Sequence, residues 1–377
     1  MDILQNTGSV IIYNIIPLII VLGIMIFFHE MGHFLVAKFF NVKVLKFALG
    51  FGPKIISREY GETEYSIRYL PLGGFVKMLG ENDFDEDADP IDEKDAERAF
   101  NVQHPLKRIA IVAAGPVFNL VLAFLLFFSF FMFYGKPDPD SEPSYIPVIQ
   151  SVNKGEPADR AGLQKNDLIM SVGEKDMKKP TDITESLEGK AGIPVKITVM
   201  RDDELMSFSV VPEEGIAPDE FGKEEKRALI GIGMSYKVHV DYLDIDPLVS
   251  IKESLIETGK VIKMTCLVVV KLFQGDVPLN TIGGPIMIGQ ITGQIVQKSI
   301  DDLLPFMAVI SINLGILNLL PIPILDGGVI LFLLFELVRR KPISMNKREF
   351  AMKIGLSLLL LLMVVVFYND ILRLFTK

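Results

Sequence analysis

The sequence is poor in cysteine and histidine and carries no excess of positive charge. Its 377 residues include one cysteine, Cys266, so an intrachain disulfide framework is excluded. No histidine or basic pair stands near Cys266 to activate it, and a packing role is expected for this thiol. The net charge of −9 argues against nucleic acid as a partner. Only four histidines are present, and two of them fall within one hydrophobic run.

Apolar and charged residues are segregated along the chain. Half of the residues are hydrophobic although 23% are charged, and this combination indicates a membrane-embedded part and a polar part. Four apolar runs have the length of about 20 residues that a bilayer requires: 10–37, 109–134, 303–335 and 354–375. The third run is interrupted by the PIP sequence. The first lacks a basic n-region and a small-residue cleavage site, so we expect it to be retained.

The distribution of lysine and arginine predicts the topology. These residues follow the first apolar run and precede the fourth, which places both loops in the cytoplasm. The N-terminus, the region 136–302 and the C-terminal end are then outside. The predicted fold is a polytopic α-helical membrane protein with four transmembrane helices, a membrane-associated β-hairpin region and one extracytoplasmic α+β domain. The expected divisions are 1–40, 41–105, 106–134, 135–144, 145–215, 216–302, 303–336, 337–352 and 353–377.

The cytoplasmic region after the first helix alternates apolar and polar residues. The stretches 41–60 and 63–79 show the two-residue period of half-buried strands, and Gly73 and Gly74 permit a close backbone approach. Two interpretations are open: a structural hairpin, or an edge strand that receives an extended substrate by strand addition. The acidic run 81–97 lacks the glycine and the carboxylate of a calcium loop, and a solvated, flexible loop is expected.

The outer region begins with a linker rich in proline and aspartate at 135–144. Strands are predicted at YIPVIQSV, DLIMSV, PVKITVM and MSFSVVP, with short helices at EPADRAGL and TDITESLEG. This pattern, with Gly162-Leu163 followed by Asp167-Leu168-Ile169, resembles the PDZ domains attached to bacterial proteases. The stretch 247–273 is an amphipathic helix, either at the outer leaflet or packed beneath the PDZ-like module.

The stretch HEMGH places His29 and His33 on one face of a helix within the first apolar run. Two imidazoles at this spacing can bind one zinc ion, with Glu30 able to polarise a bound water. The alternative is a buried polar cluster that holds helices together. Polar groups in a membrane helix are costly and functional by default, which favours the metal site.

A catalytic zinc site needs a third protein ligand. His104 and His239 do not share the depth of HEMGH, whereas Asp326 does, since it lies about as far into the third apolar run as His29 lies into the first. Pro321 and Pro323 break the helix just before Asp326 and free backbone groups there. The sequence therefore predicts a zinc centre with two histidines and one aspartate.

These motifs together resemble the site-2 protease family of intramembrane zinc proteases, and within it the bacterial regulator-of-sigma-E proteases. The likeness is carried by HEMGH, GPVFN (115–119), NLLPIPILDGG (318–328), GGFVKM (73–78) and GGPIMIG (283–289). It implies that His29, His33 and Asp326 bind zinc, that Glu30 is the catalytic base and that Asn318 engages the substrate backbone. Pro321 and Pro323 match the helix-breaking prolines of the family. Asn119 is expected either to contact substrate or to pack the helices.

The resemblance also implies a substrate and a location. The expected reaction is cleavage of a single-span protein, such as an anti-sigma factor, after a first cut by another protease, in the bacterial inner membrane. The active site would lie towards the cytoplasm. This chain has room for one PDZ domain, where the regulator-of-sigma-E proteases have two. Two roles are open for this domain: it either binds a newly exposed C-terminus or blocks bulky substrates. The alternative function is an inactive membrane scaffold with a structural metal; the four dissimilar runs argue against a transporter.

Overall fold

The computed structural model describes residues 11–81, 92–141, 144–179, 181–218, 224–276, 283–298 and 300–375. The chain forms two compact units, one of Met1–Tyr134 with Ile245–Lys377 and one of Gly135–Asp244. Most of the acidic run expected to be a flexible loop, residues 82–91, lies outside the described residues, as does the start of the first apolar run.

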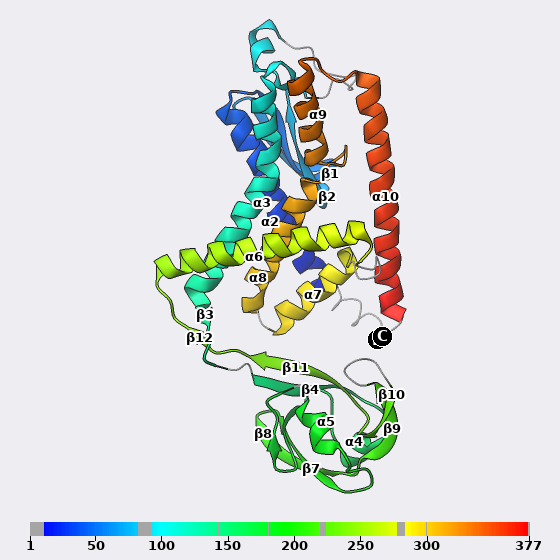
Figure 1. Ribbon diagram of the computed structural model, residues 1–377. Helices are drawn as coiled ribbons and strands as arrows, with labels where there is room; N and C mark the ends of the chain where they lie inside the picture. The colour runs from blue at the N-terminus through cyan, green and yellow to red at the C-terminus, as the bar shows by residue number, and fades with distance from the viewer. Residues whose placement is uncertain are drawn as a thin grey trace. The chain divides into compact units, whose positions relative to one another are not determined.

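The larger unit is mainly helical (Figure 1). A single π-helical turn, η1 (Ile11–Ile15), leads into α2, and two 3-10 turns, η2 (Glu93–Arg98) and η3 (Phe100–Val102), precede α3. A third 3-10 turn, η5 (Ile300–Asp302), leads into α8. The α-helices are α2 (Ile16–Phe39), α3 (Pro105–Tyr134), α6 (Pro247–Gln274), α7 (Pro285–Lys298), α8 (Leu303–Asn318), α9 (Asp326–Arg339) and α10 (Met345–Phe375).

Four helices of the described residues are long and apolar enough to cross a membrane. They span Tyr13–Phe39, Pro105–Tyr134, Ile300–Asn318 and Asn346–Arg373, which confirms the expected number of membrane-length apolar helices. The segment 303–336, expected to hold the third, is divided into α8 and α9 by residues 319–325. Pro321 and Pro323 lie in this break, where their missing N–H groups and fixed φ prevent a continuous helix.

Helix α3 is the centre of the larger unit, because α2, α8, α9 and α6 all pack against it. Its apolar side chains Ala123 and Phe127 form a buried cluster with Ala308 and Ile312 of α8. The contact with α2 is close at Gly32, where an added methyl group would overlap the backbone carbonyl of Ala114. Small residues thus let α2 and α3 approach, as at helix contacts in membranes.

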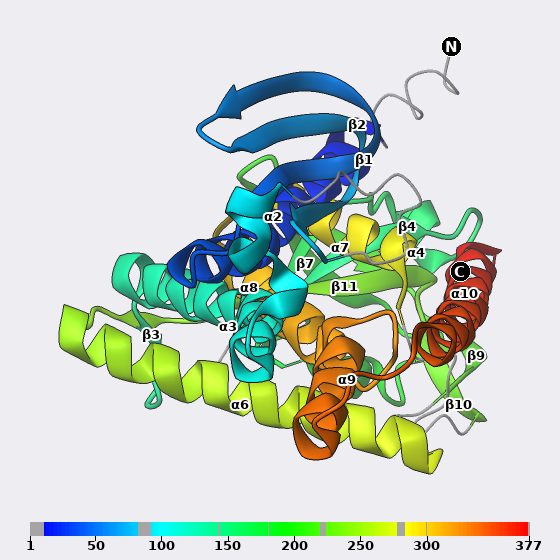
Figure 2. The same cartoon turned by 90° about the horizontal axis from the view of Figure 1, so that it is seen from above.

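Strands β1 (Val44–Tyr60) and β2 (Thr63–Met78) form an antiparallel sheet beside α2 (Figure 2). Both strands bend, so residues 44–49 pair with 74–78 and residues 46–49 also pair with 64–67. Gly50 and Gly52, with φ of 89° and 84°, provide the positive angles for the bend in β1. Residues 74–78 therefore form one edge of the sheet.

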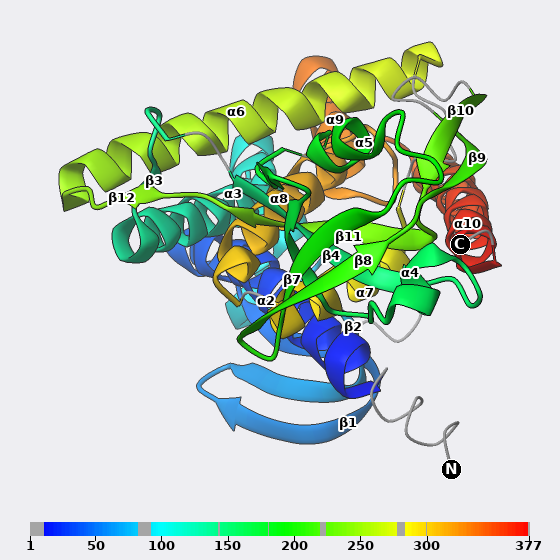
Figure 3. The same ribbon diagram turned by 90° about the horizontal axis from the view of Figure 1, so that it is seen from below.

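Helices α6 and α10 lie at the periphery of this unit (Figure 3). Helix α6 crosses α3 and α8 and packs on them, with Thr265 donating a hydrogen bond of 2.8 Å to Asn313 on α8. Helix α10 is joined to α7 through Asp370, which accepts hydrogen bonds from the backbone of Gly284, Ile286 and Met287. Most of the apolar surface of α10 is exposed, as expected for a helix that faces lipid.

The smaller unit is built on a six-stranded sheet in the order β11-β4-β5-β7-β8, with β6 beside β5. Strands β4 (Ser144–Val152), β5 (Leu168–Val172), β7 (Val195–Arg201) and β8 (Glu204–Val210), with helices α4 (Pro157–Ala161) and α5 (Asp182–Leu187), lie where the sequence predicted strands and helices. The remaining elements are β6 (Lys175–Asp176), the pair β9 (Glu213–Pro218) and β10 (Glu224–Leu229), β11 (Ile232–His239), and the pair β3 (Lys136–Pro137) and β12 (Tyr242–Leu243).

The smaller unit continues past residue 215, where the predicted domain ended. It reaches Asp244 because β11 pairs along the whole length of β4, from Ile232 opposite Val152 to His239 opposite Ser144. This pairing joins segments about 80 residues apart, and a local pattern of alternating residues does not contain such information.

Candidate metal centre

Helix α2 brings two imidazole rings together one turn apart. The Nε2 atoms of His29 and His33 lie 3.3 Å from each other. Nδ1 of His33 lies 2.9 Å from the backbone oxygen of Ile111 on α3 and donates to it. This hydrogen bond fixes the tautomer, because a ring that carries its proton on Nδ1 presents the lone pair of Nε2.

Asp326 completes the cluster from another part of the sequence. It is the first residue of α9, directly after the break at 319–325. Its Oδ2 lies 3.2 Å from Nε2 of His29 and its Oδ1 lies 3.6 Å from Nε2 of His33. Among the described residues, His29, His33 and Asp326 form the cluster whose potential ligand atoms all lie within 4.8 Å of one another.

These distances fit a zinc ion. Zinc binds nitrogen and carboxylate oxygen at about 2.0–2.2 Å in a tetrahedron, so adjacent ligand atoms lie about 3.3 Å apart. The separation of 3.3 Å between the two Nε2 atoms and that of 3.2 Å between Nε2 of His29 and Oδ2 of Asp326 are close to this value, and one ligand atom from each of the three residues lies within 4.8 Å of the others. Oδ2 of Asp326 is also buried without a hydrogen-bond partner among the described residues, and a cation would satisfy it. Three ligands leave one position for water or substrate.

Asn119 on α3 supports His29 from behind. The residue is fully buried, and its Nδ2 lies 3.2 Å from Nδ1 of His29. Its Oδ1 is buried and has no hydrogen-bond partner in the described part of the chain. A ring that binds metal through Nε2 carries a proton on Nδ1, and Oδ1 of Asn119 can accept a hydrogen bond from this N–H group after the amide rotates. The two roles expected for Asn119, substrate contact and helix packing, stay predictions, and the structure adds its contact with His29.

Asn318 and the two prolines lie on the side where α8 ends. The Nδ2 of Asn318 is 3.4 Å from Nε2 of His29, so this amide borders the cluster. Pro321 and Pro323 follow in the break, and Pro323 lies against Gly355 of α10. An interrupted helix exposes backbone groups at the depth of the cluster, which is tolerated where they line a cavity or meet protein.

Glu30 faces the edge of the sheet. An added Cβ at Gly74 would lie 2.9 Å from Cγ of Glu30 and 3.0 Å from Ile26, so only glycine allows this approach. Gly73, with φ of 118°, turns its own open side to the ring of Phe51. Residues 74–78 therefore run past Glu30 with one side paired to β1. In the described residues no strand pairs with the other side of this segment.

Gly115 is a part of the site whose role the sequence alone did not specify. In the sequence it stands only as part of the GPVFN motif. A methyl group there would overlap Nε2 of His33 and come within 2.9 Å of the ring of His29. Gly115 thus lets α3 pass directly over the two imidazoles. His104, in contrast, lies at the start of α3, where its Nδ1 accepts a hydrogen bond from the N–H of Leu106.

Comparison with known proteins gives a consistent result. The model of Peptidase family M50 matches residues 17–362. A protein of Brucella suis biovar 1 is 33% identical over 97% of this chain and 97% of its own length. A protein of Campylobacter jejuni is 36% identical over 94% of this chain and 92% of its own, and one of Clostridium acetobutylicum is 33% identical over 95% and 97%. All three bear the name putative zinc metalloprotease.

Proposed function

Because this chain belongs to peptidase family M50, the site-2 protease family, we propose that it is a zinc metalloprotease that hydrolyses a peptide bond within the transmembrane segment of single-span proteins. The observation that carries the proposal is the convergence of His29, His33 and Asp326 from two distant segments. That cluster lies in a unit with four helices of membrane length.

The proposed reaction assigns separate roles to the metal ligands and to Glu30. His29, His33 and Asp326 would hold a zinc ion, which when bound would polarise the scissile carbonyl of the substrate and lower the pKa of a bound water to about 7. Glu30 accepts the proton of the attacking water and delivers it to the leaving nitrogen. The position of Glu30, adjacent to His29 in sequence and facing Gly74, allows it to serve a peptide bound along the sheet edge.

Binding must also unwind the substrate, because a helical peptide bond is enclosed in its own hydrogen-bonded ladder. Backbone pairing with the edge at residues 74–78 would hold the unwound segment in extended form. Gly73 and Gly74 keep this edge free of side chains next to Glu30. The amide of Asn318, 3.4 Å from Nε2 of His29, adds a hydrogen-bonding group beside the metal cluster.

For the biological setting we propose regulated intramembrane proteolysis in a bacterial inner membrane. The substrate class is a single-span protein of the anti-sigma-factor type, already trimmed outside by another protease. We place the cytoplasm at the Lys- and Arg-rich end of α2 and the smaller unit outside, by the positive-inside rule. We interpret the smaller unit as a PDZ domain that either binds the new C-terminus or excludes bulky substrates. Titration with a peptide carrying that C-terminus distinguishes these roles.

The test uses purified full-length protein in detergent and a tagged single-span helix. Metal content and cleavage are measured for the wild type, Glu30→Gln and Asp326→Ala. One zinc per chain is expected in the wild type and in Glu30→Gln, with cleavage lost in the latter. Asp326→Ala should bind zinc more weakly.

Two outcomes would contradict the proposal. Undiminished cleavage by Glu30→Gln would show that Glu30 is not the catalytic base. Equal zinc affinity in Asp326→Ala and wild type would overturn the third ligand. His104→Ala is the matched control, because this histidine lies outside the cluster and the variant should keep both zinc and cleavage.

A further inference from the structure

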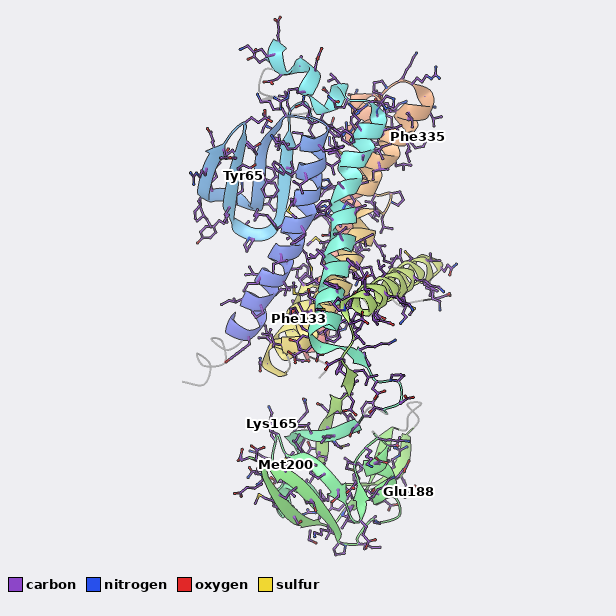
Figure 4. All side chains as sticks on the ribbon, turned by 90° about the vertical axis from the view of Figure 1, so that its left-hand side faces the viewer. Tyr65, Phe133, Lys165, Glu188, Met200 and Phe335 are labelled. Carbon is purple, nitrogen blue, oxygen red and sulfur yellow. The ribbon has the colours of Figure 1, made fainter. Side chains whose placement is uncertain are left out.

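The β1–β2 sheet has two chemically different faces. Its inner face carries Phe47 and Tyr65, whose rings contact Phe34 of α2 (Tyr65 is labelled in Figure 4). Directly opposed residues of antiparallel strands share a face, so the pairings of Lys46 with Lys77 and with Glu64 place these three side chains together on the other side. We call this other side the outer face.

The outer face is rich in positive charge. The pairing of β1 with β2 places four cations and two carboxylates on it: Lys46, Lys54, Arg68, Lys77, Glu59 and Glu64. Lys54 forms an ion pair with Glu64, and its hydrogen bond lowers the pKa of that carboxyl. The formal net charge of the outer face is +2, in a chain whose net charge is −9.

Two polar atoms on the outer face, Oγ of Ser66 and Nε of Arg68, are buried without a hydrogen-bond partner among the described residues. Ser66 is only 6% exposed, and its Oγ has no hydrogen-bond partner among the described residues. Arg68 donates from Nη1 to the oxygen of Gly52 at 2.8 Å and lies over the ring of Phe75 at 5.0 Å. Its Nε is buried and likewise has no partner in the described part of the chain. Buried polar atoms in proteins normally have a hydrogen-bond partner, which here a bound ligand would supply.

Exposed apolar residues lie at the bent end of the same sheet. Phe51, Ile55 and Leu70 are 46%, 58% and 54% exposed. The sheet also begins only five residues after α2, one of the membrane-length helices, ends. Cations next to exposed apolar side chains at the end of a membrane helix match the boundary between headgroups and acyl chains.

We propose that the outer face binds the phosphate of an anionic phospholipid, with Lys46 and Arg68 as cationic contacts and Ser66 as hydrogen-bond donor. The acyl chains would lie along the apolar bend at Phe51, Ile55 and Leu70. Charge complementarity selects an anion, and the adjacent apolar side chains select a lipid over free phosphate. The inference rests on the membrane placement in the proposed function, but it does not depend on proteolysis.

The experiment measures lipid binding to the full chain in neutral detergent by native mass spectrometry. The probe is short-chain phosphatidylglycerol, compared with phosphatidylcholine of the same chain length and with inorganic phosphate. The wild type should retain phosphatidylglycerol selectively. Removal of one cation near a phosphate is expected to weaken binding about fivefold, so Lys46→Gln with Arg68→Gln should weaken it about 25-fold.

Two further variants separate the outer face from charge in general. Lys252→Gln with Lys263→Gln removes the same charge from α6 and should leave binding unchanged. Ser66→Ala keeps every charge and should weaken binding severalfold. Zinc content, measured in each sample, identifies variants that have not folded.

Three outcomes would overturn the proposal. Equal retention of both lipids would mean that no anion is recognised. Equal loss of lipid binding in Lys46→Gln with Arg68→Gln and in Lys252→Gln with Lys263→Gln would mean that only the overall charge matters. Displacement of phosphatidylglycerol by inorganic phosphate at similar concentration would identify a soluble anion as the ligand. None of these readouts involves substrate cleavage, so a failure of the protease assay would leave the lipid result interpretable.

Discussion

The side-chain amide of Asn119 on α3 lies 3.2 Å from Nδ1 of His29 on α2, on the ring atom that does not face Asp326. A partner at this position holds the imidazole in the orientation that metal binding requires. Such supporting contacts typically change metal affinity by about 10- to 100-fold.

Replacement of Asn119 by alanine should therefore lower zinc affinity by about 10- to 100-fold without removing a ligand. Competition with a chromogenic chelator measures the effect. Asn119→Asp keeps an oxygen acceptor for the Nδ1 proton of His29 and should retain more affinity than the alanine variant. An alanine variant with wild-type zinc affinity would show that the contact only packs the helices.

Gly115→Ala should abolish zinc binding and cleavage, because the added methyl group would occupy the space of Nε2 of His33. Gly23→Ala is the matched control on α2, since nothing lies within 4 Å of its added Cβ. The control should keep zinc and gain about 0.5–1 kcal/mol of stability from better helix propensity. Equal zinc binding by the two variants would contradict the close contact of α3 with the imidazoles at Gly115.

Glu81→Gln should make stability less dependent on pH. Burial raises the pKa of Glu81 from 4.5 to about 7. A carboxyl with a raised folded pKa favours folding most below 4.5, and this contribution declines as pH rises to about 7. Glutamine keeps an acceptor for the N–H of Met78. As pH rises from 5 to 8, the free energy of unfolding of the variant should increase by about 1–3 kcal/mol relative to that of the wild type. Thermal unfolding across this pH range measures the difference.

Glu62→Gln is the control for this pH series. A hydrogen bond from Arg98 lowers the pKa of Glu62 to about 2. Its contribution to stability is present above 4.5 and lost as pH falls from 4.5 to 2. The Glu62 variant should therefore differ from wild type by a constant amount between pH 5 and pH 8. A pH-dependent difference there would contradict the assignment of the two carboxyls.

Asp370→Ala should release α10 from α7. The carboxylate is 2% exposed and accepts three backbone hydrogen bonds at the start of α7. Loss of charge-assisted bonds to buried N–H groups should cost about 2 kcal/mol or more, detected by thermal unfolding and by faster proteolysis near α10. Lys353→Ala, which removes an exposed ion pair with Glu349 on the same helix, should cost less than about 0.5 kcal/mol.

Much of the metal centre could be predicted from the sequence because its signals are local. The spacing of His29 and His33 defines one helix face, and hydropathy defines helices of membrane length. Asp326 could be predicted as the third ligand because its depth in the third apolar run matches that of His29 in the first, and depth follows from counting residues along the chain. The contact of Asn119 with His29 could not be added, since it depends on how α2 and α3 rotate against each other.

The sequence by itself therefore determined the segregation into membrane and polar parts, the helix carrying HEMGH and the break at Pro321 and Pro323, because periodicity, hydropathy and proline chemistry act over a few residues. Only the tertiary structure decided that Gly115 gives α3 its passage over the imidazoles, that Gly74 brings the sheet edge to Glu30, and that β11 completes the sheet of the smaller unit. Each of these results depends on the close packing of segments distant in the chain, where one methyl group or one shift of register changes the outcome.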